Sequence, residues 1–352
     1  MSRTYLRPTG FVDAPFGHDR KVARLAGGLC WFAAVEIVRP EGAELVPVEG
    51  IEARLGEAER AIWARLTAAR PPLQLGERTI RLDQPQVVGV LNVTPDSFSD
   101  GGRFAEAEPA IEAGHAMAAA GAALIDVGGE STRPGAKPVW EGDEAARVLP
   151  VVKRLAAAGN AVSIDTRKAS VMEQALGLGA AMVNDVSALT WDPRAPEVVA
   201  DAGCPIVLMH HRGAPETMQD DPRYDRPVPL EVYDWLEARI DAAVAAGVAR
   251  ERIVIDPGFG FGKSVQHNLQ LMNGLALLHG LGCPIMLGAS RKRTIGALSN
   301  EAPANQRLGG SIALALKGAE QGAQLLRVHD VAETLQALRV WRGLRDTALT
   351  PG

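Results

Sequence analysis

The sequence predicts an α/β protein, a TIM (β/α)8 barrel that follows an N-terminal extension. From about residue 86 onward, eight short apolar runs alternate with helix-like stretches. The runs lack the polar alternation of a half-exposed sheet, which is typical of parallel strands that helices cover on both faces. The 352 residues are enough for one barrel of about 250 residues and an extension of about eighty.

The extension covers residues 1–78 and contains no catalytic constellation, so its role is unknown. It is expected to be a small cap, an oligomer contact or a partly ordered segment. Its apolar run over 25–38 predicts a strand or a buried helix, because about fourteen residues are too few to span a bilayer. A helix is predicted over 51–69, and the prolines at 71 and 72 stop it.

The barrel covers residues 79–346 and begins with a predicted hairpin over 79–86 that closes its bottom. Glycines that follow the alanine-rich stretches are expected to end the covering helices. The predicted strands are, in order, residues 87–91, 123–127, 161–164, 182–183, 206–209, 253–255, 285–287 and 325–328, and the covering helices include 110–120, 144–157, 230–246 and 305–321.

Composition narrows the class of protein. A net charge of -5 with 22% charged residues describes an ordinary globule and argues against a nucleic-acid surface. Cys30, Cys204 and Cys283 are far apart and form no CxxC pair, which indicates a reducing compartment and no zinc site. We therefore expect a cytoplasmic protein that binds neither nucleic acid nor membrane.

Catalytic residues of a TIM barrel lie at the carboxyl ends of its strands. After the first strand, Asn92 opens a loop that carries Phe98 and Asp100. An amide oxygen and carboxylates suit Mg²⁺, which keeps several waters and bridges substrate phosphates. A turn-rich loop with local side-chain hydrogen bonds is the alternative interpretation.

The second strand is followed by a glycine-rich segment, residues 128–135. Glycines let the backbone approach a ligand closely, while Ser131 and Thr132 supply hydroxyls and Arg133 can pair with an anion. The position after a barrel strand favours an oxyanion-binding loop, although the segment is no Walker motif.

Acids and amides follow the third, fourth and sixth strands: Asp165, the pair Asn184 and Asp185, and Asp256. A nitrogen heterocycle with adjacent ring N–H and exocyclic amino groups would match them, because a carboxylate accepts paired hydrogen bonds. Each carboxylate could instead be the structural partner of a backbone N–H.

Cations follow the last two strands. Arg327 and His329 lie two residues apart in an extended segment, so their side chains share one face and can reach one anion. Arg291 is expected to be a surface salt-bridge residue. The adjacent His210 and His211 would point to opposite faces of a strand, so they predict no metal site.

The motifs that carry these residues resemble dihydropteroate synthases of folate biosynthesis. In order they are LNVTPDSFSDGG, IDVGGESTRPGA, SIDTRK, NDVSAL, MHHRGAPETMQ, DPGFGFGKS, GASRKRTIG and LLRVHDV, which together span roughly residues 87–342. The resemblance implies a pterin-binding barrel that condenses 7,8-dihydropterin-6-ylmethyl diphosphate with 4-aminobenzoate, with Mg²⁺ as cofactor and a homodimer as the assembly.

The resemblance also implies residue roles. Asp165, Asn184, Asp256 and Lys292 would hold the pterin, and Met209 would line its pocket. The diphosphate would be bound by Thr132, Arg327 and His329, with Asn92 coordinating the Mg²⁺. Phe98, Asp100, Arg133 and Pro134 would lie on two loops that close over the aminobenzoate pocket, whose other side is Phe261 and Lys292. The catalytic set would be Asp100, Arg133, Lys292, Arg327 and His329.

Two other functions compete with this interpretation. A pterin-binding methyltransferase domain would share the acidic pocket but would not need the diphosphate-binding set, which is present here. A catalytically silent paralogue should have lost loop or anion-binding residues, and this chain retains them.

Overall fold

The computed structural model describes residues 3–19, 21–94, 107–131, 138–213 and 217–349. No helix in these ranges is long and apolar enough to cross a membrane. Five of the predicted site residues lie outside the described residues: Phe98, Asp100, Thr132, Arg133 and Pro134.

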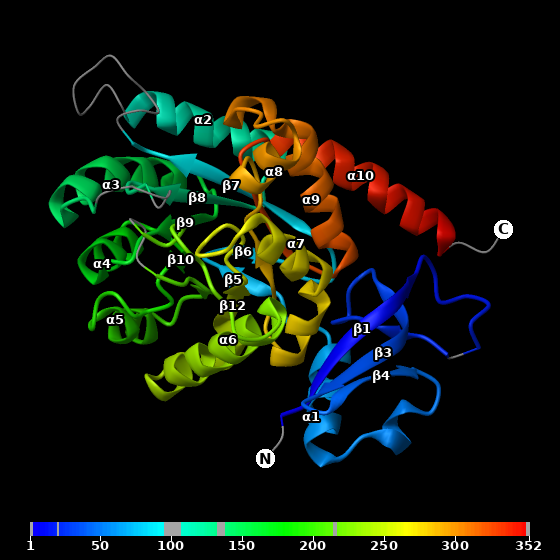
Figure 1. Ribbon diagram of the computed structural model, residues 1–352. Coiled ribbons are helices and arrows are strands. Elements are labelled where there is room, and N and C mark those ends of the chain that lie inside the picture. Colours follow the sequence, from blue (N-terminus) through cyan, green and yellow to red (C-terminus); the bar gives the residue numbers. More distant parts are fainter. Residues whose placement is uncertain (1–2, 20, 95–106, 132–137, 214–216, 350–352) are drawn as a thin grey trace.

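Eight parallel strands form the predicted barrel, and each of the eight apolar runs is a strand (Figure 1). A backbone bridge between Ile255 and Ile285 joins the two ends of the sheet, whose order is β12-β11-β10-β9-β8-β7-β14-β13. The strands are β7 (Gln86–Asn92), β8 (Leu124–Gly128), β9 (Val162–Asp165), β10 (Met182–Asp185), β11 (Ile206–Met209), β12 (Ile253–Asp256), β13 (Met286–Leu287) and β14 (Leu325–Val328).

Helices cover the outside of this sheet (Figure 1). They are α2 (Ala107–Ala120), α3 (Glu141–Ala157), α4 (Ala169–Gly177), α5 (Ala195–Ala202), α6 (Val228–Ala245), α7 (Val265–Asn273), α8 (Arg293–Leu298), α9 (Leu308–Glu320) and α10 (Val331–Ala348), with 3-10 turns η3 (Arg250–Arg252), η4 (Leu275–Leu281) and η5 (Ala304–Gln306). The helix predicted from residue 305 starts later, because η5 occupies its first turn. The glycines predicted to end helices all have positive φ: Gly121, Gly159, Gly203, Gly247 and Gly322.

A hairpin closes the bottom of the barrel, but it is formed by β5 (Leu73–Leu75) and β6 (Arg78–Ile80), not by residues 79–86. The chain turns at Gly76, whose φ of 60° favours glycine, and the predicted turn at 83–85 only leads into β7. Apolar residues of the hairpin, together with Leu82, pack on one residue at or near the amino-terminal end of each barrel strand: Val88, Leu124, Ala161, Met182, Val207, Val254, Met286 and Leu325.

The extension forms an antiparallel sheet with a helix (blue in Figure 1). It comprises β1 (Tyr5–Val12), β2 (Ala23–Arg24), β3 (Trp31–Arg39), β4 (Gly42–Pro47), η1 (Ile51–Arg54) and α1 (Glu57–Thr67). Most of the run 25–38 belongs to strand β3, so of the two predicted alternatives the strand is correct. The single helix predicted over 51–69 is instead two elements, because Gly56 adopts an extended conformation between them.

The extension packs directly on the barrel. Its buried Phe32 and Leu66 belong to the same hydrophobic cluster as the barrel residues. Polar contacts also cross the junction, since Arg70 Nη2 donates to the carbonyl of His279 at 3.0 Å and Arg345 Nη1 donates to Val12 O at 3.1 Å. The extension and the barrel therefore share one core.

Deletion of residues 1–70 is expected to destabilise the barrel, because it would expose the apolar surface that the extension covers. We expect the thermal midpoint to fall by at least about 10 °C, as the loss of several kcal/mol would in a domain of this size. Calorimetry should show one transition in the full chain and an earlier one in the truncated chain. Two transitions in the full chain, or an unchanged midpoint after deletion, would contradict a shared core.

Candidate active site

The centre of the barrel mouth is an ion-pair cluster of three strands. Arg327 on β14 lies between two carboxylates: its Nε donates to Asp126 Oδ2 and its Nη2 to Asp165 Oδ2, each at 2.6 Å. Asp126 is on β8 and Asp165 ends β9. A β-carbon on Gly128 would lie 3.4 Å from Asp165 Cβ, in ordinary van der Waals contact, so residue 128 borders the acid directly.

Asp126 holds this cluster together. Besides Arg327, it accepts hydrogen bonds from Asn184 Nδ2 at 2.9 Å and from the Ser163 hydroxyl. Its exposure is 1%, so these donors replace the water that its carboxylate would otherwise bind. Sequence reasoning assigned no role to Asp126. The available signal was a carboxylate inside a buried strand, which requires partners in the barrel.

Burial and charge act in opposite directions in the cluster. Burial raises the pKa of Asp165; the Arg327 guanidinium opposes this shift and the Asp126 carboxylate adds to it. Burial disfavours the charge on Arg327, but Asp126 and Asp165 outweigh it and raise the pKa of the guanidinium. Arg327 therefore stays positive between two acids and is the fixed charge of the site.

Asp185 does not join the cluster, contrary to the expectation that it shares the mouth with Asn184. Adjacent residues on a strand point to opposite sides, so Asn184 faces Asp126 and Asp185 faces away. Asp185 accepts from Ser187 N at 2.7 Å and from Leu189 N at 2.8 Å. It stabilises the turn after β10, which is the structural alternative stated above.

Asp256 and Lys292 form the other side of the mouth. Asp256 Oδ1 accepts from Gly258 N at 2.7 Å, while a β-carbon on Gly288 would lie 3.6 Å from its Oδ2 and 3.8 Å from Arg327 Cδ, so both side chains border Gly288. Burial raises the pKa of Asp256. Burial also lowers the pKa of Lys292 to about 7, against the attraction of Asp256. Met209 on β11 is opposite Asp256 on β12 in the parallel register, and both residues are buried.

Lys292 lies against the segment that follows β12. Its Nζ donates to the carbonyl of Phe259 and is 4.1 Å from the centroid of the Phe261 ring. An ammonium over an aromatic face is a favourable contact. The structure thus brings together Lys292 and Phe261, the two residues expected on one side of the aminobenzoate pocket.

The segments that follow the seventh and eighth strands meet at Ser290 and His329. The backbone N–H of His329 donates to Ser290 Oγ at 3.2 Å, and its Nδ1 is 3.1 Å from the same oxygen. Arg291 forms an ion pair with Asp330, with Nε 3.0 Å from Oδ2, which confirms its assignment as a salt-bridge residue. Ser290, which follows the neighbouring strand β13, therefore orients His329.

Asn92 ends β7 and is opposite Gly128 in the parallel register. In the described ranges no three His, Cys, Asp or Glu side chains are close enough to hold a metal ion. A Mg²⁺ ion held by the Asn92 amide would also take substrate oxygens and water as ligands, which is its usual state beside phosphates. The single amide oxygen fits an ion that arrives with a diphosphate.

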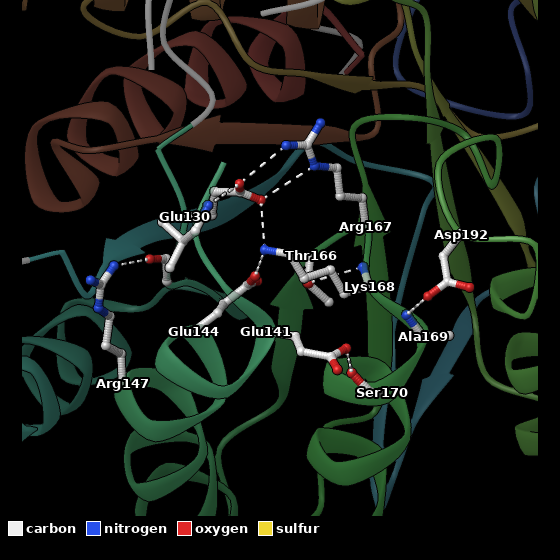
Figure 2. A network of polar contacts seen from close by, with 12 residues as sticks. Glu130, Glu141, Glu144, Arg147, Thr166, Arg167, Lys168, Ala169, Ser170 and Asp192 are labelled. Carbon is white, nitrogen blue, oxygen red and sulfur yellow. Dashed lines mark hydrogen bonds and ion pairs between the residues drawn. The ribbon is translucent and has the colours of Figure 1, made fainter. Parts of the chain in front are cut away.

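A second, buried polar network is centred on Glu130, which follows β8 (Figure 2). Glu130 accepts from Arg167 Nη2 at 3.1 Å and from Lys168 Nζ at 3.0 Å, and Lys168 also contacts Glu144. Glu130 Oε1 accepts from Val139 N at 2.9 Å. Residues 130 and 139 are thereby tied together. No sequence signal distinguished this network from surface ion pairs.

Comparisons with known proteins agree with this geometry. Residues 88–329 match the family described as pterin binding enzyme. The chain is 47% identical to the dihydropteroate synthase of Neisseria meningitidis serogroup B over 282 residues, which are 78% of this chain and 98% of the relative. It is 46% identical to that of Escherichia coli K12 over 263 residues, 74% of this chain and 92% of the relative.

Solved structures give the same result. Dihydropteroate synthase of Xanthomonas albilineans with 4-aminobenzoic acid has a TM-score of 0.74 and 48% identity, covering 79% of this chain and 99% of that chain. The same enzyme in complex with 7,8-dihydropteroate has a TM-score of 0.71 and 46% identity, covering 78% and 99%. About a fifth of this chain thus has no counterpart in these structures.

Proposed function

The chain belongs to the dihydropteroate synthases of the pterin-binding enzyme family, and from this premise we propose how its residues carry out the reaction. It condenses 7,8-dihydropterin-6-ylmethyl diphosphate with 4-aminobenzoate and releases 7,8-dihydropteroate and diphosphate. The observation that carries the assignment of the site is Arg327, held between the carboxylates of Asp126 within β8 and Asp165 at the end of β9.

The pterin ring would be bound by Asp165, Asn184 and Asp256. A carboxylate accepts the paired ring N–H and amino donors of a pterin, and the amide of Asn184 can donate as well as accept. Asp126 orients two of the residues around it, because it accepts from both Asn184 and Arg327. Lys292 and Met209 would complete the pocket on the side of β11 to β13.

The diphosphate would be bound by Arg327, His329 and Thr132. Nε and Nη2 of Arg327 face the acids, so we assign Nη1 to the diphosphate. This places one guanidinium between the pterin acids and the leaving group. Asn92 would hold Mg²⁺ together with the diphosphate, and the ion would neutralise charge that builds on the leaving oxygens.

The reaction requires a good leaving group more than a strong base. The carbon–oxygen bond breaks and its electron pair leaves on the diphosphate, where Arg327 and His329 stabilise the charge. Asp165 and Asp256 favour the electron-poor pterinylmethyl group that remains. The amine nitrogen of 4-aminobenzoate, largely unprotonated at neutral pH, then forms the carbon–nitrogen bond and loses a proton.

Water must be kept from the electron-poor carbon while the diphosphate leaves. We assign this role to the loops that carry Phe98, Asp100, Arg133 and Pro134, which lie outside the described residues. Glu130 Oε1 accepts from Val139 N, which joins described residues on either side of the second loop at a buried carboxylate.

The test is incubation of the full chain with pterin diphosphate, 4-aminobenzoate and Mg²⁺. We expect dihydropteroate by mass spectrometry together with one diphosphate for each product. A pterin-binding methyltransferase domain or a silent paralogue would give neither product, and that result would refute the proposal.

The lowered pKa of Lys292 predicts the pH dependence of aminobenzoate use. If the ammonium is the form that binds, kcat/KM for 4-aminobenzoate should fall as pH rises above about 7, the pKa of this amine. Lys292→Arg, which keeps its charge at all working pH values, should remove this alkaline limb. An alkaline limb of unchanged position in the arginine variant would assign the titration to another group.

Two further properties are part of the proposal. A cytoplasmic location is supported by three cysteines that are buried and unpaired: Cys30, Cys204 and Cys283. A homodimer is supported by large apolar side chains exposed on α8 to α10, namely Leu298, Leu308, Val340 and Leu344. Sedimentation of the full chain would give its mass in solution.

A further inference from the structure

The segment after β12, residues Gly258 to Gly262, is held by side chains along its whole length. The Gly258 and Phe261 carbonyls accept from Lys263 Nζ at 2.9 and 3.1 Å, and that of Phe259 accepts from Lys292. The Gly260 carbonyl accepts from Gln219 Nε2 at 2.5 Å, and that of Gly262 from the Tyr224 hydroxyl at 3.0 Å. Five consecutive carbonyls thus have side-chain donors from four different residues.

Lys263 is the donor that ties this segment to the barrel. In addition to the two carbonyls, its Nζ lies 2.8 Å from His210 Nδ1 at the end of β11. Its exposure is 2%, and that of His210 is 3%. Burial lowers the pKa of both groups well below their ordinary values. A buried amine of this kind is stable only with its hydrogen bonds made, so its position is closely fixed.

The backbone around Lys263 leaves no space for adjustment. A β-carbon on Gly258 would lie 1.7 Å from His210 O, and one on Gly262 would lie 2.3 Å from Arg212 O. Both glycines have positive φ, 64° and 62°. The segment is therefore seated directly on the chain that follows β11, and Lys263 joins the two.

The same segment positions the aminobenzoate side of the site. Phe261 presents its ring to Lys292 Nζ, and a β-carbon on Gly260 would lie 2.9 Å from Lys292 Cδ. A shift of the segment would move Phe261 and Lys292 together. It would leave Asp126, Asp165 and Asn184 in place, because these lie on β8 to β10.

We propose that Lys263 is a positioning residue for 4-aminobenzoate, which fixes the Gly258 to Gly262 segment against His210 and so places the Phe261 ring and the Lys292 amine. Lys263 Nζ is within hydrogen-bond distance of two carbonyls of the segment and of His210 Nδ1. The inference rests on the proposed function, since it assigns Phe261 and Lys292 to the aminobenzoate side.

The test compares Lys263→Met with the wild type in steady-state assays of the full chain. We expect the KM for 4-aminobenzoate to rise about tenfold or more, because displacements near 1 Å in a reactive site have effects of this size. The KM for pterin diphosphate should rise clearly less, since Asp165 and Asn184 lie on other strands and, of the pterin acids, Asp256 alone adjoins the segment, through its bond to Gly258 N. A general loss of structure would raise both KM values or lower only kcat.

Two other variants make the comparison sharper. Lys263→Gln keeps one donor and should give an intermediate KM for 4-aminobenzoate; it also replaces the methionine variant if that one does not fold. Tyr224→Phe is the matched control, because it removes one hydrogen bond at Gly262 but none at Gly258 or Phe261. Its KM values should stay within about twofold of the wild type.

Hydrogen exchange of the peptide that spans residues 257–264 gives a measurement independent of turnover. We expect faster exchange in Lys263→Met than in Tyr224→Phe. Unchanged exchange, or an equal rise of both KM values, would overturn the role of Lys263. Absence of product from the wild type would instead refute the proposed function, while faster exchange would still support Lys263 as the anchor of the segment.

Discussion

Arg327→Ala is expected to lower kcat/KM for pterin diphosphate by about 10³-fold, the effect of removing a charged donor that stabilises a developing anion. The guanidinium does two things that alanine cannot do. It offers Nη1 to the diphosphate, and it compensates the buried carboxylates of Asp126 and Asp165, which it contacts at 2.6 Å. The measurement is the rate of diphosphate release over a range of pterin diphosphate concentrations.

The same substitution should also destabilise the protein. Removing one partner of a buried ion pair leaves an uncompensated charge and costs about 3–5 kcal/mol. Arg327 retains 19% exposure, so water reduces this cost, and part of it disappears when Asp165 takes up a proton. Arg291→Ala is the matched control: its ion pair with Asp330 is more exposed, and we expect nearly unchanged turnover and stability. Similar losses in both variants would contradict a special role for Arg327.

Asp256→Asn is expected to weaken pterin diphosphate binding by about 10²-fold, since a hydrogen bond to a charged group contributes about 1.5–3 kcal/mol. The amide keeps the shape of the side chain and can still accept from Gly258 N. Unlike the carboxylate, the amide cannot accept hydrogen bonds from both the ring N–H and the amino group of the pterin. Binding measured by calorimetry and kcat/KM should therefore fall together.

Although Asp256→Asn should weaken pterin binding, it should not lower the stability of the folded protein. Burial raises the pKa of Asp256, so the folded protein binds its proton more tightly than the unfolded chain does. Stability from this group is lost as pH rises through the raised pKa, and the ionised acid is a cost at neutral pH. A neutral amide removes that cost, so the thermal midpoint should stay equal or rise. Asp256 also raises the pKa of Lys292, and the alkaline limb should move to lower pH in the variant. A lower midpoint with unchanged pterin affinity would show that Asp256 is a structural residue.

The sequence predicted the barrel because each apolar run was buried on both faces, and burial is the property that a run of valine, leucine and isoleucine reports. All eight runs are strands. The hairpin was placed six residues too late, since Asp83 and Pro85 are as turn-like as Gly76 and only packing under the barrel decides between them.

The sequence indicated the candidate site where a polar residue lies at or next to the end of a strand, as for Asp165, Asn184, Asp256 and Arg327. It was not predictable where partners decide the role. Asp126 and Asp185 are both buried acids, but one faces the barrel interior and the other caps a turn. The network of Glu130 joins residues from three separate segments of the chain, so charge patterns along the sequence do not reveal it. The packing of the extension on α6, η4 and α10 likewise depends on contacts far apart in sequence.

The assignment of the barrel mouth as the pterin site is best examined by titrating a pterin alcohol that lacks the diphosphate into three proteins. The wild type should bind it. Asp256→Asn should lose most of this affinity, whereas Arg327→Ala should lose more affinity for pterin diphosphate than for the alcohol, because its Nη1 is assigned to the leaving group. If Asp256→Asn bound the alcohol as tightly as the wild type did, the strand-end acids would not be the groups that hold the ring.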